Sequence, residues 1–167
     1  MDGEVKPAGA VDRETAATAD DKLELRVWLR LLSCANRIEQ DVRQELRAAF
    51  GMTLPRFDLL SQLERAPAGL TMGELSRRLM VTRGNVTGLI DRLVEEGLVR
   101  RTPMPSDRRA AIVKLTPAGA AAFREMLPNH EAVIAAKLGA MKRSDLRQLQ
   151  SLLGRLKDRL QDRAAGG

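Results

Sequence analysis

The sequence predicts a mainly α-helical protein that carries one small β-hairpin. Apolar residues recur at steps of three and four along most of the 167 residues, which is the period of amphipathic helices. Leu, Ala, Arg and Glu dominate and favour helices, whereas aromatic residues make up only 2% of the chain. Strand character is confined to residues 98–115, around a turn-rich loop. With 44% hydrophobic residues, this length suits one domain or two small subdomains that share a core.

Charge is distributed unevenly along the chain. Residues 1–21 contain six acidic and two basic residues, a net charge of −4, and are rich in Ala, Gly and Thr, so we expect a disordered acidic tail. The whole chain carries a formal charge of +6, so residues 22–167 carry +10. A basic folded body suggests a polyanionic partner, although solvated arginines alone give the same balance.

We find no targeting or membrane signal in the sequence. No apolar run approaches 18 residues, so no transmembrane helix is expected. The N-terminus has no basic region followed by an apolar core, which a secretory signal requires. The single cysteine cannot form an internal disulfide and fits a reducing compartment. We therefore expect a cytoplasmic protein that does not bind a membrane.

Residues 22–50 form the first predicted helix. Gly51 suits the position just after its C-terminus. Thr53, followed by Leu54 and Pro55, is typical of the start of a second helix. The apolar stripe of the first helix consists of Trp28, Leu31, Leu32, Ala35, Ile38, Val42, Leu46 and Ala49. The predicted buried face of the second consists of Phe57, Leu60 and Leu63.

Two short helices with a brief connection follow. Thr71 and Glu74 have the spacing of a capping box, in which each residue bonds the other's backbone at a helix start. Thr82 can cap the next helix, which extends to Gly97. So short a connection, residues 80–81, predicts a helix-turn-helix, the alternative being an ordinary helical hairpin.

A basic hairpin is predicted directly after the helix-turn-helix. Residues 98–102 and 111–115 have strand character, and residues 103–107 form a turn-rich loop. Between Leu98 and Lys114 there are five basic residues and one acidic residue. A basic hairpin at this place makes the motif a winged helix. Ordinary solvent-exposed charge explains this excess of basic residues poorly.

Two further helices complete the predicted fold. Thr116 and Pro117 suit the cap and first position of a helix, in which Pro128 should cause a kink or an interruption. Ser144 and Asp145 open the last helix. Its heptad-like seam consists of Leu146, Leu149, Leu153, Leu156 and Leu160. We expect residues 22–52 and 117–163 to form a helical dimerisation region around a winged helix-turn-helix of residues 53–116, with packing inside one chain as the alternative.

Two glycines mark the outer face of the helix predicted over residues 82–97. Gly84 and Gly88 lie opposite its apolar side, although glycine costs about 0.5–1 kcal/mol relative to alanine inside a helix. Major-groove recognition helices bring their N-terminal residues against base edges, where missing side chains allow close approach. The alternative is that both glycines arose by neutral substitution and are tolerated without a function. The residues predicted to contact DNA from this helix are Thr82, Arg83, Gly84, Asn85, Thr87, Gly88 and Arg92.

The hairpin turn supplies a second set of predicted DNA contacts. A narrow minor groove attracts inserted arginines, and Arg108 and Arg109 lie beside the turn. Asp107 would repel phosphate, so we expect it to pair with an arginine, Arg109 being the nearest choice. The predicted contacts from the turn are Ser106, Asp107, Arg108 and Arg109. The acids later in the preceding helix should face away from phosphates or hold arginines in place.

The run GLTMGELSRRLMVTRGNVTGLIDRLVEEGLVRRTPMPSDRRAAIVKLTPAG resembles the MarR family. The similarity rests on the helix-turn-helix, the phrase LIDRLVEEGLVRR, a wing with DRR, and LTPAG at the start of the next helix. It implies a homodimer whose terminal helices interlock and whose two recognition helices meet a pseudo-palindromic DNA operator. It also implies a repressor that a small-molecule effector releases from double-stranded DNA.

The stretch TLPRFDLLSQLERAPAGLTMGELSRRLMVTRGNVTGL is similar to family members that sense aromatic acids or their coenzyme A thioesters. Such an effector needs an apolar slot and cations for its acidic groups. The candidate ligand-binding residues are Trp28, Leu32, Arg37, Arg56, Phe57 and Leu60. The alternative for the aromatic residues is simple core packing. We expect no cofactor.

Three alternatives to an effector-responsive regulator remain. A redox-sensing repressor would use Cys34, although we expect this thiol to be a buried small hydrophobe among leucines. A winged-helix module for protein interaction is disfavoured by the basic wing. An enzyme is not expected, because the sequence has one His and one Cys and lacks nucleophile-elbow and P-loop motifs.

Overall fold

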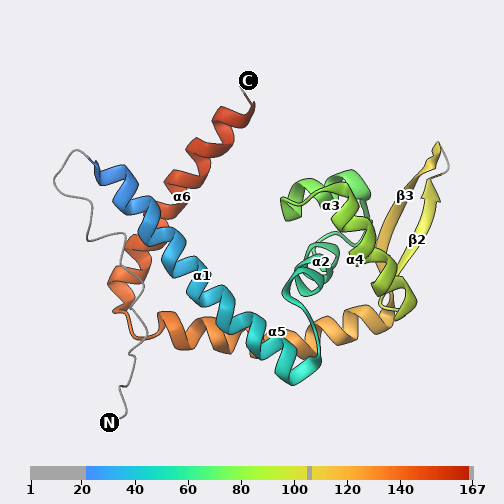
Figure 1. Ribbon diagram of the computed structural model, residues 1–167, viewed down its shortest axis with the longest axis horizontal. Coiled ribbons are helices and arrows are strands. Elements are labelled where there is room, and N and C mark those ends of the chain that lie inside the picture. The colour runs from blue at the N-terminus through green and yellow to red at the C-terminus, as the bar shows by residue number, and fades with distance from the viewer. Residues whose placement is uncertain (1–21, 105–106, 166–167) are drawn as a thin grey trace, which may run out of the picture. The chain divides into compact units, whose positions relative to one another are not determined.

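The computed structural model describes residues 22–104 and 107–165, with the backbone alone for 107–110 and 163–165. It confirms a mainly helical chain with a small antiparallel sheet (Figure 1). The elements are α1 (Leu23–Phe50), α2 (Leu54–Glu64), β1 (Leu70–Thr71), α3 (Met72–Leu79), α4 (Arg83–Glu95), β2 (Val99–Met104), β3 (Asp107–Leu115), α5 (Pro117–Leu138) and α6 (Arg143–Ala165). The predicted acidic tail, residues 1–21, lies outside the described residues. The chain divides into one compact unit that ends at Gln40 and a second that begins at Asp41.

Local capping signals set the helix starts as the sequence predicts. The Thr71 hydroxyl accepts a bond from the Glu74 backbone N–H, and the Glu74 carboxylate accepts one from the Thr71 backbone N–H at 2.7 Å. These bonds lower the pKa of the Glu74 carboxyl, the backbone N–H of Thr71 contributing most. Thr82 caps α4 and Thr116 caps α5 in the same way, each accepting a backbone N–H. Gly51 follows α1 with φ +62°, which suits a left-handed position after a helix.

The core of the second unit lies where α2, α3 and α4 pack together and against the sheet and α5. Leu60 of α2, Leu75 of α3 and Ile90 of α4 are fully buried. Their burial leaves the opposite sides of α3 and α4 at the surface, as amphipathic periodicity predicts. The further side chains with no more than 3% exposure are Val42, Leu46, Phe57, Leu59, Leu63, Leu70, Val86, Leu93, Val99, Val113 and Met126.

The wing is longer than the sequence predicts. β3 lies between β1 and β2, and both pairings are antiparallel, with Leu70 opposite Val113 and Val99 opposite Leu115. The predicted loop of residues 103–107 is wrong, because β2 extends to Met104 and β3 begins at Asp107. Pro103 is tolerated in β2 because this strand lies at the sheet edge, where a missing N–H breaks no central ladder. The short strand β1 was not predicted.

α5 continues through a proline that we expected to disrupt it. The helix is unbroken from Pro117 to Leu138, so Pro128 does not interrupt it. Buried contacts on both sides of Pro128, from Phe123, Met126 and the stacked ring of His130, hold the helix in place. At its N-terminal end, a Cβ on Gly119 would lie 1.9 Å from the Leu98 carbonyl oxygen. Only glycine lets α5 begin this close to the chain that leads into β2.

Within residues 22–104 and 107–165, every helix falls short of the combination of length and apolarity that crossing a bilayer requires.

Candidate nucleic-acid interface

The outer face of α4 is open to solvent at every residue predicted to contact DNA. Val86, Ile90 and Leu93 are fully buried and orient the helix against the core. The side chains on the opposite side therefore point outward. The exposed residues of this face are Thr82, Arg83, Gly84, Asn85, Thr87, Gly88 and Arg92.

The two glycines of α4 do not make room for any described part of the chain. A Cβ built on Gly84 or on Gly88 meets nothing within 4 Å. This contrasts with Gly119, where the backbone of Leu98 would collide with a side chain. Packing inside the described residues therefore gives no reason for glycine at either position of α4.

A groove of about 410 Å³ runs along this outer face. Its floor at Gly84 and Gly88 is bare backbone, and Asn85 and Arg92 supply polar groups at its sides. Amide and guanidinium groups are the donors that pair with adenine and guanine edges. The lining residues are Pro55, Val81, Gly84, Asn85, Gly88, Leu89 and Arg92.

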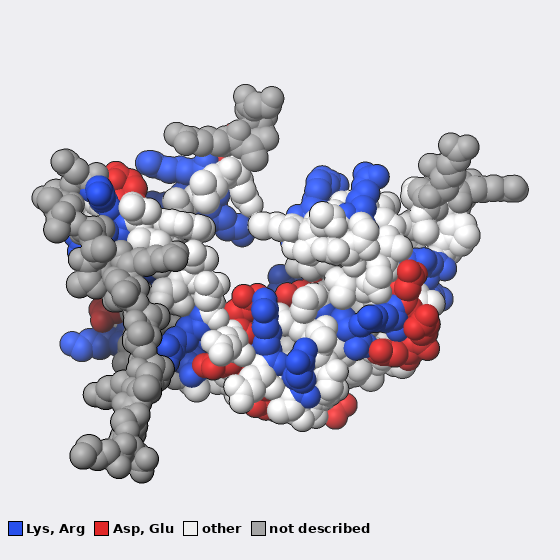
Figure 2. Space-filling view, in the orientation of Figure 1, with Lys and Arg blue, Asp and Glu red and all other residues white. Residues whose placement is uncertain are grey.

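Acids in the C-terminal half of α4 hold arginines from neighbouring elements. Asp91 accepts from Arg101 of β2 at 2.6 Å, and Glu96, which caps α4, pairs with Arg56 of α2. Acidic and basic side chains accordingly lie side by side over this end of α4, whereas basic side chains project from an uncharged surface over α3 (Figure 2). The expectation that these acids hold arginines in place is confirmed for both pairs. They join α4 to the wing and to α2.

Arg56 was predicted as a ligand-binding residue and is mostly buried. Its side chain is 12% exposed, and its Nε is buried without a hydrogen-bond partner among the described residues. A cavity of about 410 Å³ adjoins it. The lining residues are Phe50, Gly51, Met52, Arg56, Glu96, Leu98, Ala122, Glu125 and Met126.

The other candidate ligand residues fall into two groups. Phe57 and Leu60 belong to the core: Leu60 is fully buried, and the Phe57 ring lies 5.2 Å from Phe123 and 4.7 Å from His130, between ring centroids. Trp28, Leu32 and Arg37 lie in the unit that ends at Gln40 and are exposed. The list of Trp28, Leu32, Arg37, Arg56, Phe57 and Leu60 remains a prediction.

His130 is a second polar group inside a largely apolar setting. Its ring stacks on Phe57, and its Nδ1 is buried with no hydrogen-bond partner in the described part of the chain. Burial lowers the pKa of His130, and the nearby Glu131 carboxylate acts in the opposite direction. His130 lines a groove along α5, and Arg65 and Arg143 line this groove too.

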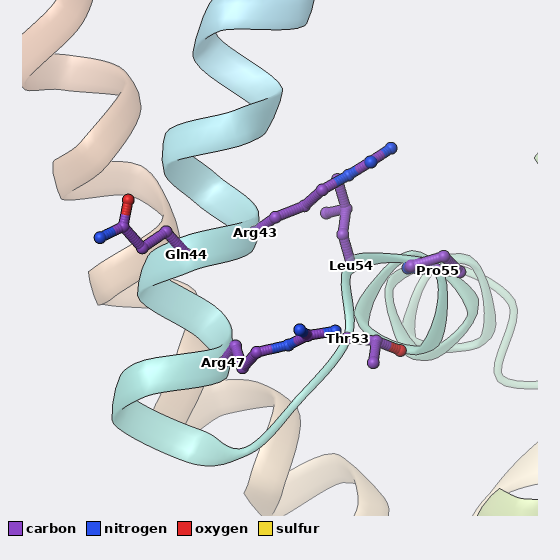
Figure 3. Close-up of a pocket in the computed structure, with 6 residues that line it drawn as sticks. All are labelled: Arg43, Gln44, Arg47, Thr53, Leu54 and Pro55. Atoms are coloured by element: carbon purple, nitrogen blue, oxygen red, sulfur yellow. The ribbon is translucent and has the colours of Figure 1, made fainter.

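A basic pocket of about 690 Å³ lies between the last turns of α1 and the start of α2. Arg43 and Arg47 extend from α1 towards Leu54 and Thr53 (Figure 3). Sequence reasoning singled out neither arginine. Their spacing of four residues, which places both on one helix face, was the available signal.

The contacts predicted from the turn of the wing stay a prediction. Ser106 lies outside the described residues, as do the side chains of Asp107, Arg108 and Arg109.

The expectation of a buried Cys34 is wrong, because this residue is exposed on α1. Its neighbour Leu32 is exposed too, so the apolar side of this part of the helix lacks the cover that the expectation required. No cluster of three metal-ligating side chains occurs in the part of the chain that the structure describes.

Comparison with known proteins assigns this architecture. Residues 50–110 match the model of the MarR family. Over 161 residues the chain is 35% identical to the transcriptional activatory protein BadR of Rhodopseudomonas palustris, with 91% of each chain covered. The chain belongs to the MarR family.

Solved MarR-family structures agree with this assignment. A MarR family transcriptional regulator from Silicibacter pomeroyi is 32% identical, with a TM-score of 0.72, and the match covers 86% of this chain and 99% of that one. A mutant of MarR from Escherichia coli, complexed with operator DNA, is 26% identical with a TM-score of 0.70, covering 83% and 99%. The winged helix-turn-helix described above is therefore that of a MarR family transcriptional regulator.

Proposed function

We propose that this chain is an effector-responsive repressor that binds a pseudo-palindromic DNA operator as a homodimer in the cytoplasm. The observation that carries the proposal is the outer face of α4, where Gly84 and Gly88 leave bare backbone and no described residue fills the space. Close approach by a large external partner is the physical reason for such a face. The operator complex of the related Escherichia coli protein supports DNA as that partner.

The base-reading part of the proposal assigns α4 to the major groove. Asn85 can pair bidentately with adenine, and Arg83 or Arg92 can reach guanine or phosphate. Thr82 and Thr87 suit phosphate contacts. Arg108 and Arg109 of the wing are proposed to enter the minor groove, with Ser106 and Asp107 beside them.

The effector is proposed to be an aromatic acid or its coenzyme A thioester. Arg56 supports an acidic ligand, because its buried Nε lacks a partner among the described residues and a cavity adjoins its side chain. An acid that bound this guanidinium would compete with Glu96, the cap of α4. Release of Glu96 would loosen α4 from α2 and lower the affinity for DNA.

The first experiment is titration of DNA from upstream of the chain's own gene, with and without p-coumaroyl-coenzyme A. We expect tight binding that weakens steeply with salt and is released by micromolar thioester but not by free coumarate. Binding that ignores the thioester would remove this effector and keep the DNA-binding function. No binding at low salt to any fragment of the region would contradict the function itself.

The direction of regulation needs its own measurement, because the related BadR bears the name of a transcriptional activatory protein. In vitro transcription from the bound promoter should fall when the protein is added if it is a repressor. A rise would make it an activator at that promoter.

Redox control through Cys34 is a second candidate, because the thiol is exposed. Peroxide would then weaken DNA binding by the wild-type protein and leave Cys34→Ser unaffected. Equal behaviour of the two proteins would remove this alternative.

A further inference from the structure

The basic pocket between α1 and α2 has the composition of an anion site. Two arginines line it from one face of α1, Arg43 extending towards Leu54 and Arg47 towards Thr53 (Figure 3), and the lining of this pocket contains no carboxylate among the described residues. Each guanidinium offers a planar fork of donors that matches phosphate geometry. The cavity that adjoins Arg56, by contrast, includes Glu96 and Glu125. The residues around the basic pocket are Arg43, Gln44, Arg47, Thr53, Leu54 and Pro55.

Thr53 adds a hydroxyl to this pocket. It occupies the N-cap position of α2, yet its side chain makes no capping bond. Its hydroxyl is therefore not used for the role that Thr71, Thr82 and Thr116 perform at the other helix starts. A hydroxyl in a pocket that two guanidiniums also line can donate to an oxyanion bound there.

The pocket adjoins the proposed DNA face. Pro55 lines both the basic pocket and the groove on α4 that contains Gly88 and Arg92. A ligand in the pocket would therefore lie next to whatever occupies that groove. This position fits a phosphate on the DNA backbone beside the contacted bases, or an acidic ligand that competes with DNA.

We propose that Arg43, Arg47 and Thr53 bind a phosphate group. The phosphate has two sources of the same chemistry: the backbone of the operator, or the phosphates of a coenzyme A-type effector. Both sources depend on the proposed function, whereas binding of a free phosphate compound does not depend on it. A failure of the phosphate site can therefore be distinguished from a failure of the proposed function.

The first test uses pyrophosphate and the full chain in isothermal titration calorimetry at low salt. We expect saturable binding that weakens at least tenfold in Arg43→Gln/Arg47→Gln and several-fold in Thr53→Val. The matched control, Arg155→Gln/Arg159→Gln, removes the same charge at the same spacing from exposed positions of α6 and should bind as wild type. Circular dichroism checks that each variant is folded. No saturable binding by wild type, or equal affinity in the double variant, overturns the proposal.

The second test identifies the source. If operator phosphates occupy the site, the slope of log affinity against log salt should fall by about 0.9 for each phosphate contact that Arg43→Gln/Arg47→Gln removes. If an effector occupies it, that slope stays unchanged, and coenzyme A binds wild type and the α6 control but not the double variant. Wild-type behaviour of the double variant towards both DNA and coenzyme A overturns the proposal.

Discussion

Gly88 illustrates, at the scale of one residue, how stability and binding can be separated. Its Cβ would meet nothing, so Gly88→Leu should leave stability unchanged or raise it by about 0.5–1 kcal/mol. The added side chain would fill the groove on α4, so affinity for DNA should fall at least tenfold. Thermal unfolding and DNA titration measure the two effects.

Gly154 provides the matched control. It is another helical glycine whose Cβ would meet nothing, but it lies on α6. Gly154→Leu should gain similar stability and keep wild-type affinity for DNA. Normal DNA binding by Gly88→Leu would mean that DNA does not lie on this face.

His130 predicts a pH dependence of stability. Because burial lowers its pKa in the folded protein, the unfolded chain takes up this proton at a higher pH. Stability should therefore fall as the pH drops below about 6.5, towards the lower folded value. His130→Phe removes this contribution and offers another ring to Phe57. Urea unfolding from pH 7.5 to 5 should show a shallower loss in the variant.

Comparison of wild type with His130→Phe isolates the effect of one imidazole, since His130 is the single histidine of the sequence. Glu131, Arg65 and Arg143 line the same groove and are present in both proteins. Parallel stability curves for wild type and His130→Phe would show that this imidazole does not couple protonation to folding.

At the scale of elements, two threonines of α4 separate helix stability from DNA contact. The Thr82 hydroxyl accepts from the Asn85 backbone N–H at the helix start, whereas Thr87 lies inside the helix and donates to the Arg83 carbonyl at 2.9 Å. Thr82→Ala should cost about 1 kcal/mol of unfolding free energy, because an N-cap is lost. Thr87→Ala should be neutral or slightly stabilising, because alanine favours a helix interior.

DNA titration of the same two variants tests the proposed contacts. Loss of affinity in Thr87→Ala would arise without loss of stability and would therefore report a contact. Wild-type affinity in Thr87→Ala would remove this residue from the interface. A Thr82→Ala protein of wild-type stability would contradict the capping role.

At the scale of the whole molecule, α6 leaves large apolar side chains uncovered in the single chain. Leu153 is 39% exposed, Leu156 41% and Leu160 61%. These residues belong to the seam that predicts dimerisation. Leu156→Glu should convert the proposed homodimer to a monomer and weaken operator binding, because two recognition helices would no longer be joined. Light scattering after size exclusion measures the mass.

Ser151 is the control for this substitution, since it is exposed on the opposite side of α6. Ser151→Glu introduces the same carboxylate and should leave the oligomeric state unchanged. A Leu156→Glu protein that remains dimeric, or a wild-type protein that is monomeric at micromolar concentration, would contradict the proposed interface.

Local chemistry made most helix boundaries predictable from the sequence. A cap such as Thr71 or Thr116 acts on backbone groups three residues away, so its effect is visible in a short stretch. The expectations that were wrong concerned the burial of Cys34, an interruption of the helix at Pro128 and the loop of the wing. Each depends on what packs beside the residue or on where a strand lies in the sheet, and local spacing contains neither.

By itself the sequence determined the helical fold class, the order of the helices and the hairpin, and the outward face of α4. Those properties follow from caps and from apolar periodicity, which act over a few residues. Only the tertiary structure decided that Gly84 and Gly88 border open space, and that Arg56 pairs with Glu96, 40 residues away. It alone joined Arg43 and Arg47 of α1 to the start of α2 in one pocket. The physical reason is that contacts between elements depend on packing in three dimensions, which no local pattern specifies.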